Sequence, residues 1–127
     1  MTWAIIVTFV LLGWVLSLLT HEVSHVVANK LVGRTITAFK PWPHLHNGKF
    51  YFGRASSIGP SAGLMWVHAS PLIKGALLCP IWVALGLWVY TPFFLFMATD
   101  LIDMLWWFKG FVFGPLRTDG SKFRRKL

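Results

Sequence analysis

The stretch LLTHEVSHVVANKL, residues 18–31, places two histidines and a glutamate inside an apolar segment that begins near the N-terminus. About 20 residues of helix, at 1.5 Å each, cross the hydrocarbon core of a bilayer, so a helix over 3–32 is long enough to span it. An ionisable residue at membrane depth costs at least ~2.5–3.5 kcal/mol and is a functional candidate for that reason. We therefore predict that His21, Glu22 and His25 form a site within the membrane.

The composition is typical of an integral membrane protein and not of a soluble domain. Hydrophobic residues make up 56% and charged residues 13% of the 127 residues, whereas soluble domains contain about 45–50% and about 25%. A chain of this length forms one domain at most, and its single cysteine, Cys79, excludes an intrachain disulfide. The first apolar segment lacks a basic start and a small-residue cleavage site, so we expect it to be retained and not removed as a signal peptide.

The positive charges are confined to two regions of the chain. Of twelve Lys and Arg residues, five lie between Lys30 and Arg54, six lie from Lys109 onward, and only Lys74 falls in an apolar segment. Basic residues beside apolar spans stay on the cytoplasmic side, which predicts an outside N-terminus and a cytoplasmic C-terminus, in the cell (inner) membrane. The same charges favour membrane lipids with anionic headgroups as partners. Nothing besides the net charge of +8 indicates nucleic acid, so we expect no such partner, and no feature predicts an oligomeric state.

Three membrane-spanning helices are expected, in a mainly α-helical membrane fold. The first ends near Val32, because Gly33 suits the position just after a helix. Ser70-Pro71 and Thr91-Pro92 each combine an N-cap residue with a proline suited to the first helical turn. The spans are predicted at about 3–32, 71–90 and 92–111, in a single membrane domain, 1–113, that precedes a basic cytoplasmic tail, 114–127.

A short β-hairpin is expected between the first and second spans, over about 35–54. Asn47-Gly48 lies between aromatic and β-branched residues, and a type I′ turn requires positive φ at both of its central residues. The strands are predicted near 35–40 and 49–54, and Pro41 and Pro43 indicate an interrupted ladder or an edge strand. The alternative is a cytoplasmic loop whose aromatic residues anchor it at the membrane interface.

The residues HEVSH, 21–25, have the spacing of a zinc site on a helix. Positions i and i+4 lie on one face, so both imidazoles can reach one Zn²⁺ at about 2.0–2.1 Å. The adjacent Glu22 can take a proton from a water molecule that the metal activates. The alternative is that the cluster caps the first span in the headgroup layer, but Lys30 lies roughly 13 Å farther along the helix than His21. The metal site is therefore the favoured interpretation.

A third zinc ligand is expected from the third span, because catalytic zinc usually has three protein ligands. Asp100 and Asp103 lie at i and i+3, at depths that match those of the two histidines. We favour Asp100, because the small Ala98 and Thr99 precede it and allow close approach, with Asp103 as the alternative ligand. A pairing of one of the two aspartates with Lys74 is the competing interpretation.

These features resemble the site-2 protease family of intramembrane zinc metalloproteases. The resemblance lies in HEVSH on an early span, the Asn-Gly hairpin after it and an aspartate on the third span. It implies a three-helix core in which two histidines and an aspartate bind zinc, Glu22 acts as the general base and the hairpin offers a substrate edge. The family's aspartate commonly precedes glycine, which Asp100 and Asp103 do not; Asp119-Gly120 does, but it ranks third because it lies in the tail.

The predicted function is hydrolysis of peptide bonds in membrane-protein or peptide substrates by an intramembrane zinc endopeptidase. The alternative is a non-catalytic small membrane subunit or a structural component of a larger membrane assembly. The remaining histidines are weaker candidates: we expect His44 and His46 to be exposed beside the turn, and His68 to be a satisfied polar residue at the interface. The aromatic residues 106–108 are expected to form an interfacial belt beside Lys109.

Overall fold

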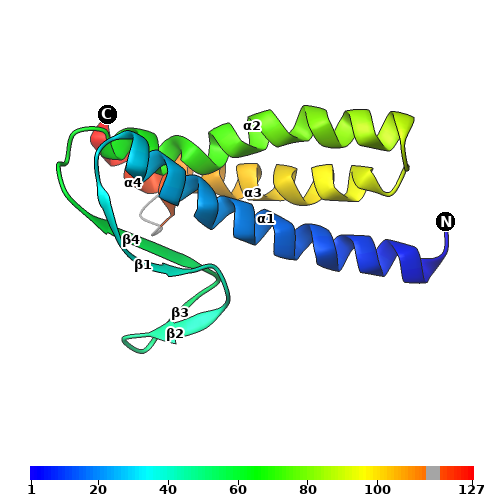
Figure 1. Ribbon diagram of the computed structural model, residues 1–127, viewed down its shortest axis with the longest axis horizontal. Coiled ribbons are helices and arrows are strands. Elements are labelled where there is room, and N and C mark those ends of the chain that lie inside the picture. The colour runs from blue at the N-terminus through cyan, green and yellow to red at the C-terminus, as the bar shows by residue number, and fades with distance from the viewer. Residues whose placement is uncertain (114–117) are drawn as a thin grey trace.

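The computed structural model describes residues 1–113 and 118–127, and it is mainly helical (Figure 1). Residues 114–117, at the start of the predicted tail, lie outside the described residues. The helices are α1 (Trp3–Leu31), α2 (Leu64–Trp88), α3 (Phe93–Phe113) and α4 (Asp119–Lys126). The strands are β1 (Thr35–Lys40), β2 (His44–His46), β3 (Lys49–Tyr51) and β4 (Arg54–Ile58).

The three long helices lie side by side, and the hairpin and α4 lie at one end of them (Figure 1). The N-terminus and the short turn between α2 and α3 are at the opposite end. The C-terminal part of α1, the start of α2 and the end of α3 therefore meet at the end where α4 packs against α2 and α3.

The first helix ends where the sequence predicts. Its last residue is Leu31, and Gly33 follows in the left-handed region with φ 78°, a conformation that glycine adopts without the steric penalty of a Cβ atom. The second helix differs from the expectation: it begins at Leu64, seven residues before the predicted start, so that Pro71 lies inside the helix and not at its first position.

The hairpin is formed by two short ladders in line with each other. β1 pairs with β4 from Thr35↔Ile58 to Lys40↔Arg54, and β2 pairs with β3. The turn has φ 51° at Asn47 and φ 72° at Gly48, which confirms the positive φ values that a type I′ turn requires. The ladders are interrupted opposite the prolines at 41 and 43, and the pairing extends to Ile58, beyond the predicted end of the hairpin.

The interior of the helix bundle is unusually polar, and its outside is apolar. Among the described residues, the buried hydrophobic side chains are Val67, Ala69 and Trp107, whereas the buried polar and charged ones are Ser17, Glu22, Asn29, Ser70, Lys74, Thr99, Asp100 and Ser121. Large apolar side chains such as Trp3, Leu11 and Leu105 are more than half exposed. Within the described chain, two helices, α1 and α2, are long and apolar enough to cross a membrane.

The predicted tail contains a helix that folds back onto the end of the bundle. Phe123 of α4 packs against the rings of Trp107 and Phe111 on α3. Gly120 is buried, and a Cβ atom there would collide with the backbone carbonyl of Trp107. The missing side chain at residue 120 therefore lets the first turn of α4 lie directly on α3.

Candidate metal centre

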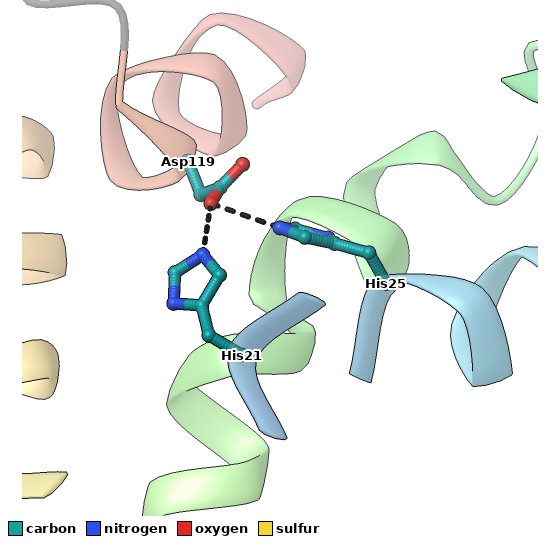
Figure 2. Close-up of side chains that lie close together, drawn as sticks. All are labelled: His21, His25 and Asp119. Carbon is teal, nitrogen blue, oxygen red and sulfur yellow. Dashed lines mark hydrogen bonds and ion pairs between the residues drawn. The ribbon is translucent and has the colours of Figure 1, made fainter. Parts of the chain in front are cut away.

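Two histidines and an aspartate converge where α4 meets α1 (Figure 2). His21 and His25 lie one turn apart on α1, and Asp119 is the first residue of α4. The Nε2 atoms of His21 and of His25 each lie 3.1 Å from Oδ2 of Asp119. The structure therefore places both predicted histidine ligands together, on one face of the helix, with Asp119 between them.

The other nitrogen of each histidine faces an acceptor. Nδ1 of His21 lies 2.9 Å from both carboxylate oxygens of Asp103, and Nδ1 of His25 lies 3.0 Å from the backbone oxygen of Val67. Because a carboxylate and a carbonyl only accept, each Nδ1 carries a hydrogen, and the neutral form of each imidazole would present its Nε2 lone pair to a metal ion, whereas without a metal Nε2 can donate to Asp119. Both Nε2 atoms and one carboxylate oxygen of Asp119 thus point toward one another.

This arrangement of donors fits a zinc ion. All three ligand atoms lie within 4.8 Å of one another, and tetrahedral bonds of about 2.0–2.1 Å would place neighbouring ligand atoms roughly 3.3 Å apart. Metal-binding histidines commonly donate their second N–H to a carboxylate or a backbone carbonyl, as His21 does to Asp103 and His25 does to Val67. The residues that could hold the metal are therefore His21, His25 and Asp119.

The favoured ligand of the sequence analysis, Asp100, lies elsewhere in the bundle. Its carboxylate is 2% exposed and accepts from Lys74 at 2.8 Å, from Ser17 at 2.9 Å and from Trp82 at 2.7 Å. The competing interpretation, a pairing with Lys74, is what the structure shows. Asp103 lies 3.1 Å from the same Lys74 and contacts His21 through Nδ1, on the opposite side of the ring from Asp119.

From the sequence alone, Asp119 is the least favoured of the three aspartate candidates, because it lies beyond the last predicted span. The structure brings it to the histidines because α4 turns back over the end of the bundle, so its position in the chain does not set its distance from α1. The one signal that could have found it was the Asp119-Gly120 dipeptide. The glycine is needed here because any larger residue would hold the first turn of α4 away from α3.

The carboxyl of Asp119 is ionised and available as a ligand. Burial raises its pKa, but the electrostatic interaction with His25 and the hydrogen bonds with His21, His25 and His68 lower it more. The pKa of Asp119 therefore lies well below its usual range, because hydrogen bonds and an opposite charge favour the ionised form.

Glu22 lies at a cavity of about 520 Å³ next to the histidines and the hairpin. Its side chain is 8% exposed, and among the described residues it has no hydrogen-bond or ion-pair partner. A Cβ atom at Gly53 would come within 2.8 Å of a Glu22 carboxylate oxygen, so the hairpin backbone passes close to this group. The cavity is also lined by both histidines, His68, Asp119 and residues 50–55 of the hairpin.

The other histidines and the aromatic residues 106–108 differ in how close they lie to the cavity. His68 reaches the cavity, with Nδ1 3.7 Å from Oδ1 of Asp119. His44 and His46 belong to β2, and neither lines this cavity. Trp106 is 57% exposed beside Lys109, as an interfacial belt would require, whereas Trp107 is buried and donates to the backbone oxygen of His68.

Replacement of Gly120 by alanine is expected to weaken zinc binding at least ~10–100-fold, a loss typical of disturbed ligand support. The added methyl group would collide with the backbone of Trp107, which cannot yield as a flexible side chain can, so Asp119 would move away from the histidines. Chelator competition on purified protein measures this affinity. Lys126→Ala, at an exposed position of the same helix that does not line the cavity, is the matched control. Unchanged affinity in Gly120→Ala would show that α4 does not need this contact to deliver Asp119.

Comparisons with known proteins identify no relative of this chain. No protein-family model, curated protein or solved structure matches it.

Proposed function

We propose that this chain is an intramembrane zinc metalloprotease that cleaves peptide bonds of membrane-associated substrates. The observation that carries the proposal is the convergence of the Nε2 atoms of His21 and His25 on the carboxylate of Asp119, while each Nδ1 is held by an acceptor. Two neutral imidazole nitrogens and a carboxylate that face one another inside a protein repel one another unless a metal ion or protons lie among them, and a metal ion can take the place of those protons. Histidine nitrogens with one carboxylate are a ligand set of catalytic zinc.

The distribution of negative charge supports the same proposal. The chain has four acidic residues and a net charge of +8. Three of the four lie at this site: Glu22 lines the cavity, Asp119 contacts both histidines, and Asp103 contacts His21. The fourth, Asp100, is paired with Lys74 elsewhere in the bundle. A chain with so few carboxylates therefore places most of them where a divalent cation would be held.

The proposed chemistry is hydrolysis with Glu22 as the general base. His21, His25 and Asp119 would hold the zinc ion, which would supply a Lewis acid for activating a water molecule and polarising a carbonyl. Glu22 takes a proton from the attacking water molecule while the oxygen of that water bonds to the carbonyl carbon of the substrate. Glu22 then passes that proton to the peptide nitrogen as the C–N bond breaks, which leaves a new carboxyl end and a new amino end. An unpartnered carboxylate at the cavity suits this role.

The substrate is proposed to bind as an extended segment beside the hairpin. A helix hides its carbonyls in its own hydrogen bonds, so a peptide bond in a helix must be unwound before it can be attacked. Phe52 and Gly53 lie between the two ladders, are paired in neither, and line the cavity next to Glu22. Their backbone groups are suited to pair with an incoming strand.

The site is proposed to lie at membrane depth, with α3 as the third span. The polar interior and apolar exterior of the bundle support this placement, because only the outside of a membrane protein faces lipid. The N-terminus would then be outside and the C-terminus cytoplasmic, in the cell membrane, with the cations of α4 near anionic headgroups. In this orientation the metal centre lies at the cytoplasmic end of the bundle.

Glu22→Gln is expected to keep about one zinc per chain and to lower hydrolysis by at least ~10²–10⁴-fold, because it removes the base without removing a ligand. The assay uses internally quenched apolar peptides in detergent micelles, with zinc measured by elemental analysis on the same sample. Lys30→Gln, at an exposed position of the same helix, should retain both zinc and activity. Equal cleavage by Glu22→Gln, or a wild-type protein that binds no zinc, would favour the non-catalytic membrane subunit instead.

A further inference from the structure

We infer that Pro71 is a positioning residue of the metal centre. Because proline has no backbone N–H, Pro71 leaves the carbonyl oxygen of Val67 available to hold the ring of His25. The inference deepens the proposed function and rests on it, since it concerns a residue that would set how His25 binds zinc.

Pro71 interrupts the backbone hydrogen bonding of α2. In an α-helix the N–H at position i donates to the carbonyl at i−4, so residue 71 would normally donate to Val67. Pro71 lies inside α2 and is fully buried, and it cannot make this bond. The carbonyl of Val67 therefore lacks its usual partner from the helix backbone.

Two side chains donate to the Val67 carbonyl in place of the missing backbone N–H. The Val67 oxygen accepts from the hydroxyl of Ser70 at 2.7 Å and from Nδ1 of His25, on the neighbouring helix, at 3.0 Å. A carbonyl oxygen has two lone pairs, so both are in use. A third donor, the N–H that any other residue at 71 would supply, would compete directly with His25.

The hydrogen bond from His25 to the Val67 carbonyl is linked to the metal centre. Donation from Nδ1 to Val67 fixes both the tautomer and the orientation of the His25 ring, so that Nε2 faces Asp119. Such outer partners of metal-binding histidines typically affect metal affinity 10–100-fold, as an order of magnitude. His21 has Asp103 for this purpose, whereas His25 depends on a backbone carbonyl that only a proline four residues later leaves unoccupied.

The same helix supplies a control. Pro80 also lies inside α2, but it is exposed, and the carbonyl that it leaves without a backbone donor is that of Ala76. Within the part of the chain that the structure describes, no side chain donates to that carbonyl, and neither residue lines the cavity. A proline in the middle of α2 is thus tied to the site at position 71 and not at position 80.

The experiment compares zinc affinity in three variants of the full chain, purified in detergent, by competition with a chromophoric chelator. Pro71→Ala restores the N–H and should weaken zinc binding about 10–100-fold. Pro80→Ala should bind zinc as the wild type does. In the third variant, lactic acid is introduced at position 71 by nonsense suppression, so that an ester replaces the amide between residues 70 and 71. This variant has neither the proline ring nor a backbone N–H, and it should bind zinc with wild-type affinity.

The outcomes separate this inference from the proposed function. If Pro71→Ala binds zinc as tightly as the wild type, the inference is overturned and the metalloprotease proposal stands. If the lactic acid variant binds zinc as weakly as Pro71→Ala does, the proline ring matters and not the missing N–H. That result also overturns the inference about Pro71. If the wild type itself binds no zinc, the proposed function fails, and the inference fails with it.

Discussion

Asp119→Ala is expected to abolish stoichiometric zinc binding, whereas Asp100→Asn is expected to leave about one ion per chain bound. Asp119 supplies the carboxylate oxygen that lies 3.1 Å from each histidine Nε2, so its removal leaves two ligands where a catalytic site needs three. The Asp100 carboxylate is instead engaged by Lys74, Ser17 and Trp82. Elemental analysis of detergent-purified protein measures both.

Matched variants make this result interpretable. Asp119→Asn keeps the size of the side chain but removes its charge, and it should also lose most of the zinc, because an amide oxygen is a poorer ligand for this ion than a carboxylate. The assignment of Asp119 would be refuted if its variants kept zinc while Asp100→Asn lost it. That outcome would restore the ligand set that the sequence alone favoured.

Lys74→Met is expected to lower the free energy of unfolding by about 3–5 kcal/mol, the usual cost of removing one partner from a buried ion pair. Lys74 is 8% exposed and lies 2.8 Å from Asp100 and 3.1 Å from Asp103. Its loss would leave the Asp100 carboxylate in the bundle interior without a counter-charge. Reversible unfolding in mixed detergent micelles, followed by tryptophan fluorescence, measures the change.

Two further variants test the cause of that loss. Lys74→Met combined with Asp100→Asn should recover part of the stability, because the second change removes the uncompensated charge. Lys109→Met should change stability by less than about 0.5 kcal/mol, because this lysine is exposed and lies over the ring of Trp106. A loss in Lys74→Met no larger than that in Lys109→Met would mean that the buried charges do not depend on each other.

Features that depend on neighbouring residues could be predicted from the sequence. The length of α1 follows from its long apolar segment, and its end at Gly33 follows from interactions within about one helical turn. The Asn47-Gly48 turn follows from the φ values of two adjacent residues. The placement of His21 and His25 on one face, with Glu22 beside them, follows from the pitch of a helix.

The role of Pro71 could not be predicted in this way. Ser70-Pro71 has the local pattern of a helix start, and that pattern was the basis for placing the second span at 71. The helix continues through it because the carbonyl of Val67 receives donors from Ser70 and from His25, 42 residues away in the chain. A local pattern says which backbone group lacks a partner, but only packing shows what replaces it.

The sequence by itself determined a mainly helical chain with apolar segments long enough for a membrane, a tight hairpin, and two histidines and a glutamate grouped on one helix. Only the tertiary structure decided which aspartate joins them. His21 and Asp119 are 98 residues apart, and they meet because α4 folds back on α3 through a glycine contact that no local propensity encodes. Matching depths along separate helices favour Asp100 or Asp103 as the third ligand, but the distance between two side chains is set by how those helices pack.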